Sequence, residues 1–300
     1  MTSMTSPGPI LAATDFSAPA RHAAERAAHL AHETGAPLTL MHVLPGAALQ
    51  ELREWLGAGH PMAQQLRDEA DRHLGALVAE LQTHRHVTIR PVQSTGSPLV
   101  EIGRECEDQD ASLLVVGARG AGFLRQLVLG TTSERLLRRT RRPILVVRHK
   151  PHEAYRRVLV ALDFSPWSAH AIALARRVAP QARLLLFNAY QVPFESKLRY
   201  AGVDAATMDH YRQQARADAL QRVLSLAASS GLKAGEWAPC IVEGDASQSI
   251  LEQEQEGDCD LVVLGKHGRS AVDDMLLGSV SKHVLAEGST DVLVSTAREA

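Results

Sequence analysis

The sequence is short of net charge, of cysteine and of long apolar runs. Its 300 residues carry a formal net charge of −2, which indicates neither a nucleic acid nor an anionic membrane as a partner. The cysteines are Cys106, Cys240 and Cys259, and their spacing matches neither a disulfide framework nor a CxxC metal site. No run approaches the ~18 consecutive apolar residues that a membrane-spanning helix needs. Residues 1–9 also lack the basic start and apolar stretch of a signal peptide, so we expect a soluble, cytoplasmic protein.

What the sequence does contain is one glycine-spaced stretch, present twice. An apolar run ends in glycine, and then come two residues, a glycine, nine residues, a glycine and a hydroxyl residue. The first copy has Gly117, Gly120, Gly130 and Thr131, and the second has Gly265, Gly268, Gly278 and Ser279. All four pairs have the same offset (265 − 117 = 148). A repeat of this length is a whole domain, so we expect one domain at 1–150 and a second at 151–300.

Apolar runs alternate with helical patterns in both halves. Helices are expected at about Ala63–Leu81, Pro98–Glu107 and Thr131–Arg139, and a long one within Val203–Ser230. Strands are expected at Ile10–Ala13, Leu38–Leu44, Val87–Val92, Leu113–Val116, Ile144–Val147, Val158–Leu162, Arg183–Tyr190, Trp237–Val242, Leu261–Leu264 and Asp291–Ser295. This alternation predicts right-handed crossovers and parallel sheets. The expected fold is two tandem α/β domains, each an open five-stranded, Rossmann-like parallel sheet with helices on both faces.

The glycine stretch has the chemistry of a phosphate cradle. Ligands of open parallel sheets bind beyond the carboxyl ends of the strands, where Gly117 and Gly265 lie. Glycine there permits a positive φ and lets backbone N–H groups approach an anion. Gly130 and Gly278 precede helices whose first turns attract phosphate, and Thr131, Thr132, Ser279 and Ser281 can add hydroxyl groups. The stretch is neither a Walker A loop nor a GxGxxG fingerprint, and structural glycines in a turn would also be copied by a duplication.

Asp15 and Asp163 end the first strand of each half. A carboxylate at this edge can accept both hydroxyls of a ribose. An Asx turn or a helix cap explains an aspartate at the same position, and the sequence alone does not separate these interpretations.

These residues resemble the universal stress protein family. The resemblance rests on the spacing G-x2-G-x9-G-[ST], the strand that ends in Asp, the turns at Gly96 and Gly244, and a terminal strand. It covers nearly the whole chain as two tandem family domains. Members with this glycine pattern bind ATP, whereas another branch lacks the pattern and does not. The resemblance also implies that the strands Ile144–Val147 and Asp291–Ser295 pair.

The resemblance assigns roles residue by residue. In the first half Asp15 would hold ribose, Ala13 and Val43 would lie by the adenine and nucleoside, and Gly117, Gly120, Gly130, Thr131 and Thr132 would hold phosphates. The matching positions in the second half are Ala161, Asp163, Gly265, Gly268, Gly278, Ser279 and Val280. Either Asn188 or Ala189 stands where the first half has Val43, so the sequence does not decide which residue lies by the adenine in the second half.

The two cradles differ in charge. The first loop carries Arg119 and Arg125. A capping box formed by Thr131 and Glu134 would compete with phosphate there, whereas the second helix has Lys282 in place of Glu134. The second loop carries Lys266, His267, Arg269, Asp273 and Asp274. We therefore expect two sites of unequal affinity.

The leading hypothesis is a regulatory protein that binds ATP, with Mg²⁺ arriving on the nucleotide. No residue supplies an obvious general base, although Asp15 and Asp163 could orient a water, so a slow ATPase is one alternative. A nucleotide-independent scaffold is the other. A homodimer and an unidentified protein partner stay open. The arginines from Arg135 to Arg142 fit a solvated or partner-facing patch, and the scattered histidines indicate no metal site.

Overall fold

The computed structural model describes residues 8–57, 60–120, 129–192, 197, 200–266 and 277–296. The chain divides into two compact units. Unit 1 comprises Met1–Ala154 with Asp291–Ala300, and unit 2 comprises Tyr155–Thr290. Both are α/β units, so the expected fold class is confirmed.

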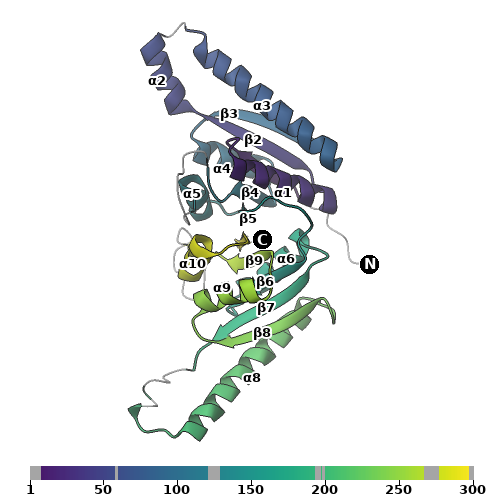
Figure 1. The fold of residues 1–300 in the computed structure, drawn as a ribbon, viewed down its shortest axis with the longest axis vertical. Coiled ribbons are helices and arrows are strands. Elements are labelled where there is room, and N and C mark those ends of the chain that lie inside the picture. The colour runs from purple at the N-terminus through teal and green to yellow at the C-terminus, as the bar shows by residue number, and fades with distance from the viewer. Residues whose placement is uncertain are drawn as a thin grey trace. The chain divides into compact units, whose positions relative to one another are not determined.

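Unit 1 is built on a sheet of parallel strands in the order β3-β2-β1-β4-β5, with β10 added antiparallel beside β5 (Figure 1). The pairing of the two last strands is therefore confirmed, with Leu293 opposite Leu145. Helix α1 packs against α3, and α4 packs against α5. The elements are β1 Ile10–Thr14, α1 Ala18–Thr34, β2 Leu38–Pro45, α2 Gly46–Leu56, α3 Met62–Arg85, β3 Ile89–Gly96, α4 Pro98–Asp108, β4 Leu113–Gly117, α5 Thr131–Arg139, β5 Ile144–Val147 and β10 Asp291–Ser295.

Unit 2 repeats the first four strands in the same order. Its parallel sheet runs β9-β6-β7-β8, which corresponds to β4-β1-β2-β3. The elements are β6 Arg157–Ala161, α6 Trp167–Val178, β7 Arg183–Tyr190, α8 Ala205–Ser229, β8 Trp237–Glu243, α9 Ala246–Glu256, β9 Leu261–Gly265 and α10 Ser279–Glu287. In both units the carboxyl ends of the parallel strands meet at one edge of the sheet, which is where a ligand of this class of fold binds.

Helix α1 shows how local sequence sets the packing. The Ser17 hydroxyl accepts a hydrogen bond from the Ala20 amide at 3.4 Å and caps the helix. Gly35 ends the helix in the left-handed conformation, with φ of 71°. The face against the sheet consists mostly of alanine, and Ala23, Ala27 and Ala28 are fully or almost fully buried. Small side chains on this face let the helix backbone lie close to the strands.

The C-terminal strand is tied to unit 1 by buried charges. Asp291 accepts a hydrogen bond from the Arg148 amide at 2.8 Å through Oδ1. Its Oδ2 lies 3.6 Å from the guanidinium Nε of Arg26, and Arg26 also donates to the Glu153 carbonyl. Asp291 and Arg26 are 3% and 7% exposed. Loss of one partner would leave a buried charge uncompensated, which is costly.

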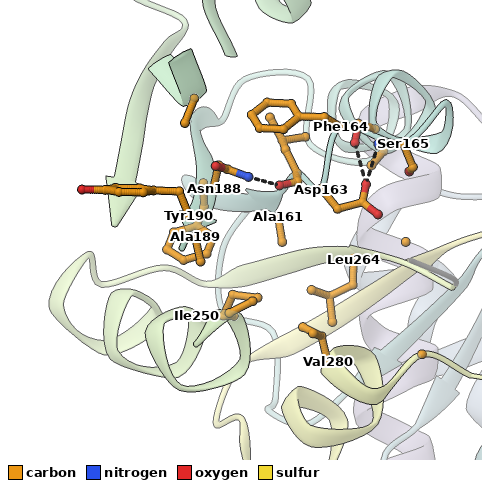
Figure 2. Close-up of a pocket in the computed structure, with 18 of the residues that line it drawn as sticks. Ala161, Asp163, Phe164, Ser165, Asn188, Ala189, Tyr190, Ile250, Leu264 and Val280 are labelled. Atoms are coloured by element: carbon orange, nitrogen blue, oxygen red, sulfur yellow. Dashed lines mark hydrogen bonds between the residues drawn. The ribbon is translucent and has the colours of Figure 1, made fainter. Parts of the chain in front are cut away.

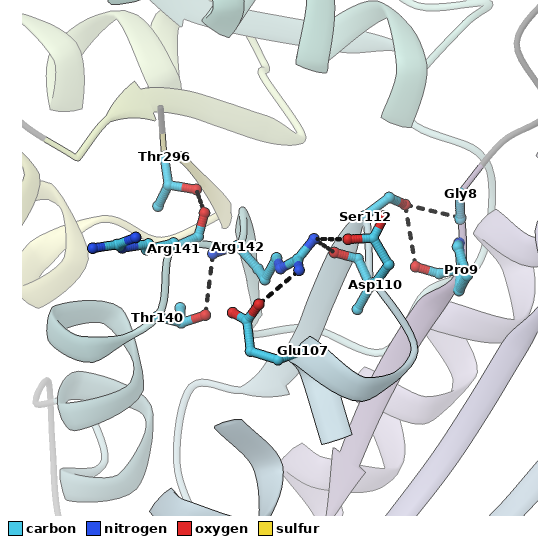
Figure 3. A network of polar contacts seen from close by, with 10 residues as sticks. Gly8, Pro9, Glu107, Asp110, Ser112, Thr140, Arg141, Arg142 and Thr296 are labelled. Carbon is cyan, nitrogen blue, oxygen red and sulfur yellow. Dashed lines mark hydrogen bonds and ion pairs between the residues drawn. The ribbon is translucent and has the colours of Figure 1, made fainter. Parts of the chain in front are cut away.

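One arginine of the expected solvated patch is buried instead. Arg142 is 6% exposed and donates to Glu107 and Asp110, both at 2.8 Å (Figure 3). The hydrogen bond to Glu107 is the main cause that raises the pKa of Arg142. The neighbouring Arg141 carbonyl accepts from the Thr296 hydroxyl just beyond β10. Arg142 therefore holds α4 to the loop before β5, and the patch interpretation was wrong for this residue.

Helix α2 was not predicted, because the segment after Leu44 contains Gly57, Gly59 and Pro61, residues that usually break a helix. The helix ends at Gly57, whose amide donates to the Arg53 carbonyl. In the part of the chain that the structure describes, no helix is long and apolar enough to cross a membrane.

Candidate functional site

A cavity of about 910 Å³ opens at the carboxyl ends of β6, β7 and β9 in unit 2 (Figure 2). This volume lies within the range of small-molecule sites, about 300–1,000 Å³. The first turns of α6, α9 and α10 and one face of α8 complete the wall. Six of the residues assigned from the sequence line it: Ala161, Asp163, Gly265, Gly278, Ser279 and Val280. Gly268 lies outside the described residues.

Within the described part of the chain, Asp163 uses only one of its carboxylate oxygens. Oδ1 accepts from the Ser165 amide at 2.9 Å and from the Ser168 hydroxyl at 3.0 Å, so the Asx turn is confirmed. Oδ2 is buried and has no hydrogen-bond partner among the described residues. A buried acceptor without a donor is costly. A ligand hydroxyl in this cavity would supply the missing donor.

An apolar slot lies beside Asp163. Figure 2 shows it between Ala161 of β6, Ala189 of β7, Ile250 of α9, Leu264 of β9 and Val280 of α10. Ile250 and Leu264 were not assigned from the sequence. Their only sequence signal is an apolar side chain on a core-facing element, which most residues of the core share.

Strand register identifies the counterpart of Val43. Thr14 is the Cα partner of His42 in unit 1, and the His42 ring Nδ1 lies 2.8 Å from the Thr14 carbonyl. In unit 2 the Asn188 amide nitrogen donates to the Leu162 carbonyl at 2.7 Å. Asn188 therefore occupies the place of His42. Ala189 occupies the place of Val43, and its smaller side chain leaves more room in the slot.

The first turn of α10 faces the cavity with free backbone donors. The helix starts after Gly278, and among the described residues no side chain caps it. The first N–H groups of a helix have no acceptor within the helix, and they attract anions. Ser279 is exposed at this end. The Ser281 hydroxyl instead donates to the Gly265 carbonyl at 2.7 Å, so it fastens α10 to the end of β9, and its assignment to phosphate was wrong.

Unit 1 has the same backbone frame. The Ser133 hydroxyl donates to the Gly117 carbonyl at 2.9 Å, as Ser281 does to Gly265. Asp15 accepts from the Ser17 amide through Oδ1, as Asp163 does from Ser165. Thr131 and Thr132 are exposed at the start of α5. The repeat therefore preserves the position of the carboxylate and of the helix N-terminus.

The glycines act by lacking a side chain. Gly117 and Gly265 do not adopt the positive φ that glycine permits. A Cβ on Gly117 would lie 2.8 Å from the carbonyl carbon and oxygen of Pro19, so glycine lets α1 approach β4. A Cβ on Gly120 would lie 2.7 Å from Asp15 Oδ2, so the carboxylate rests over this glycine.

Positive φ occurs instead at the aromatic residue after each aspartate. Phe16 has φ of 63° and Phe164 has φ of 60°, a conformation that is costly for a bulky side chain. Phe16 stacks on the buried His42, with ring centroids 4.3 Å apart. Phe164 lies under the guanidinium of Arg222. The sequence pattern DFS carried no signal of this strain.

One contact changes the expected difference in charge between the two phosphate cradles. Glu134 pairs with Arg138, with 2.6 Å between Oε1 and the guanidinium nitrogen, and in the part of the chain that the structure describes no side chain caps α5. The expected capping box of Thr131 and Glu134 is therefore wrong, and Glu134 does not occupy the first-turn donors. Several charges on which the contrast also depended lie outside the described residues: Arg125, His267, Arg269, Asp273 and Asp274.

The rim of the cavity carries a tyrosine. Tyr190 ends β7, and its hydroxyl donates to Glu243 Oε2 at 3.4 Å. Burial, followed by the negative charge of Glu243, raises the pKa of this phenol. Within the described ranges no three His, Cys, Asp or Glu side chains gather in a way that could hold a metal ion.

Comparison with known proteins gives the same family for both halves. The model of the universal stress protein family matches residues 8–148 and 154–296. A universal stress protein of Mycobacterium tuberculosis is 28% identical over 299 residues, covering 95% of both chains. One of Mycolicibacterium smegmatis is 28% identical over 298 residues, covering 95% of this chain and 96% of its own. A solved universal stress protein of Archaeoglobus fulgidus shares the fold, with a TM-score of 0.69 at 20% identity, covering 97% of this chain and 98% of its own.

Proposed function

The chain belongs to the universal stress protein family, and from this premise we propose that it is a regulatory stress-response protein that binds ATP in the cavity of unit 2. The observation that carries the proposal is Asp163. One of its oxygens completes a turn, and the other is buried with no donor among the described residues, in a side chain that lines the cavity. A purely structural aspartate would not need this second oxygen to be buried.

The cavity offers one wall for each part of a nucleotide. Asp163 Oδ2 would accept hydrogen bonds from ribose hydroxyls. The slot of Ala161, Ala189, Ile250, Leu264 and Val280 would hold the base, because it is apolar and flanked by buried strands. The uncapped first turn of α10 would hold phosphate. Mg²⁺ would be held mainly by the phosphates, as is usual for this ion.

Binding is favoured over hydrolysis by the use of the local carboxylates. Asp245 lines the cavity, but its Oδ1 accepts from the Ser247 and Gln248 amides at the start of α9. Asp163 is committed in part to its turn. Neither is arranged as a general base beside the start of α10. We therefore propose a sensor or store of ATP.

Unit 1 would bind nucleotide more weakly. Val43 is larger than its counterpart Ala189 and is 8% exposed. Phe16 covers His42 at the end of β2, and Asp15 lies over Gly120 within the glycine loop. A nucleotide would have to displace side chains that already occupy the equivalent space.

The direct test is the nucleotide content of the purified protein. The protein is denatured, and the released small molecules are separated and counted by chromatography. The expected result is adenine nucleotide at close to one molecule per chain, or ATP binding on titration if the purified protein is empty. If the protein contains no nucleotide and does not bind ATP on titration, the proposal is refuted and the nucleotide-independent scaffold is favoured. Phosphate release beyond one turnover per chain would favour the slow ATPase.

A further inference from the structure

The wall of the cavity on the α8 side has no role in the proposed mononucleotide site. Phe164, directly after Asp163, turns its ring toward α8, and the Cζ atom of Arg222 lies 4.0 Å from the ring centroid. Phe164, Arg222 and Asp218 all line the same cavity as Asp163. The cavity therefore continues from the carboxylate to a stacked pair of planar groups.

The Arg222 guanidinium lies over the Phe164 ring, and Arg222 is an exposed residue. Among the described residues it has no carboxylate partner, unlike Arg212 on the same helix, which pairs with Asp209 and Glu243. A guanidinium is planar and weakly hydrated, so its open face stacks well on another ring. Asp218 lies one turn earlier on α8, which places both side chains on one face of the helix.

We propose that the cavity of unit 2 has a second ring subsite and binds a dinucleoside polyphosphate. This inference rests on the proposed function, because the first nucleoside occupies the slot beside Asp163. The second base stacks on the open face of Arg222, which Phe164 supports from behind. Asp218 accepts a hydrogen bond from the exocyclic amine of that base. The cavity volume of about 910 Å³ lies near the upper end of the range for small-molecule sites.

Unit 1 does not share this subsite. Phe16 occupies the position of Phe164, but its ring stacks on His42 at 4.3 Å and meets the edge of His73 at 5.7 Å. Both contacts come from histidine rings of the protein itself, and no arginine of the described residues is recorded over Phe16. The second ring subsite is therefore expected once per chain.

The test compares diadenosine tetraphosphate with ATP by isothermal titration calorimetry on the full chain. Stacking of a base on a side chain strengthens binding by roughly tenfold. Wild-type protein is thus expected to bind the dinucleotide about tenfold more tightly than ATP. Arg222→Ala is expected to reduce this ratio to about one, and Asp218→Asn to reduce it in part. Arg216→Ala is the matched control, because Arg216 is an exposed arginine of α8 that does not line the cavity.

Arg222→Lys separates stacking from charge. Lysine keeps the positive charge but lacks the planar group, so it is expected to lose the preference as Arg222→Ala does. A preference retained in Arg222→Lys would overturn the proposal, because charge on the longer phosphate chain would then explain it. Equal affinities of wild-type protein for both ligands would overturn the proposal alone. If the protein binds neither ligand, the proposed function is overturned as well.

Discussion

Replacement of Asp163 by asparagine separates a binding role from a structural one. Asparagine keeps Oδ1, so the bonds from the Ser165 amide and the Ser168 hydroxyl are retained. The change replaces only Oδ2, the buried oxygen that has no partner among the described residues. It removes the acceptor of the ribose and puts a donor in its place.

The two expected effects have opposite signs. A hydrogen bond to a charged group contributes about 1.5–3 kcal/mol, so ATP should bind about 10- to 150-fold more weakly. In the ligand-free protein an unsatisfied buried carboxylate oxygen is removed, so the free energy of unfolding should stay the same or rise by about 1 kcal/mol. Titration calorimetry gives the first value and urea unfolding without nucleotide gives the second.

Asp15→Asn in unit 1 is the matched control and should change the tightest ATP binding by less than about twofold. Two results would refute the reasoning. Unchanged ATP affinity in Asp163→Asn would mean that Oδ2 does not contact the nucleotide. Weaker binding together with a loss of stability would mean that the carboxylate acts by holding the turn.

Two further predictions concern stability. Gly117→Ala should lower the free energy of unfolding by about 1–3 kcal/mol, since its Cβ would meet the Pro19 backbone at 2.8 Å. Gly75→Ala, whose Cβ would have nothing within 4 Å, should raise the free energy of unfolding by about 1 kcal/mol. Equal effects of the two variants in urea unfolding would contradict this prediction. Burial, then the charges of Arg85 and Arg26, lower the pKa of His29 from 6.5 to about 4. The unfolded chain takes up this proton first, so about 1–3 kcal/mol of stability should be lost as pH falls from 6.5 to 4. His29→Gln should reduce this dependence of the free energy of unfolding on pH. An unchanged dependence would exclude His29 as its cause.

Much of the fold follows from local pattern. The strands Ile144–Val147, Arg183–Tyr190 and Asp291–Ser295 have the bounds expected from their apolar runs, because strands of a covered sheet are buried on both faces. Helix α2 did not follow, since its only buried side chain is Leu49. A helix with so little buried surface leaves almost no periodic signal.

The candidate site, like the fold, could be predicted from the sequence only in part. The repeat placed Asp163 and Gly278 at the edge where the cavity opens. Arg222 comes from a distant helix, and nothing in its local sequence points to Phe164. Glu134 had two candidate partners, the helix start and Arg138 one turn later, and in the structure it pairs with Arg138. Such competition between local contacts is decided by geometry that a linear pattern does not contain.

The most direct test of the account is ATP binding by Gly130→Asp and Gly278→Asp. Both glycines precede a helix with φ near −60° and ψ near 150°, values that any residue can adopt. Aspartate is also a favourable helix cap, so both variants should fold. Each puts a carboxylate where phosphate is proposed to bind. Gly278→Asp should weaken ATP binding by more than about tenfold, with little change in Gly130→Asp. Equal dissociation constants for the two variants would contradict the account.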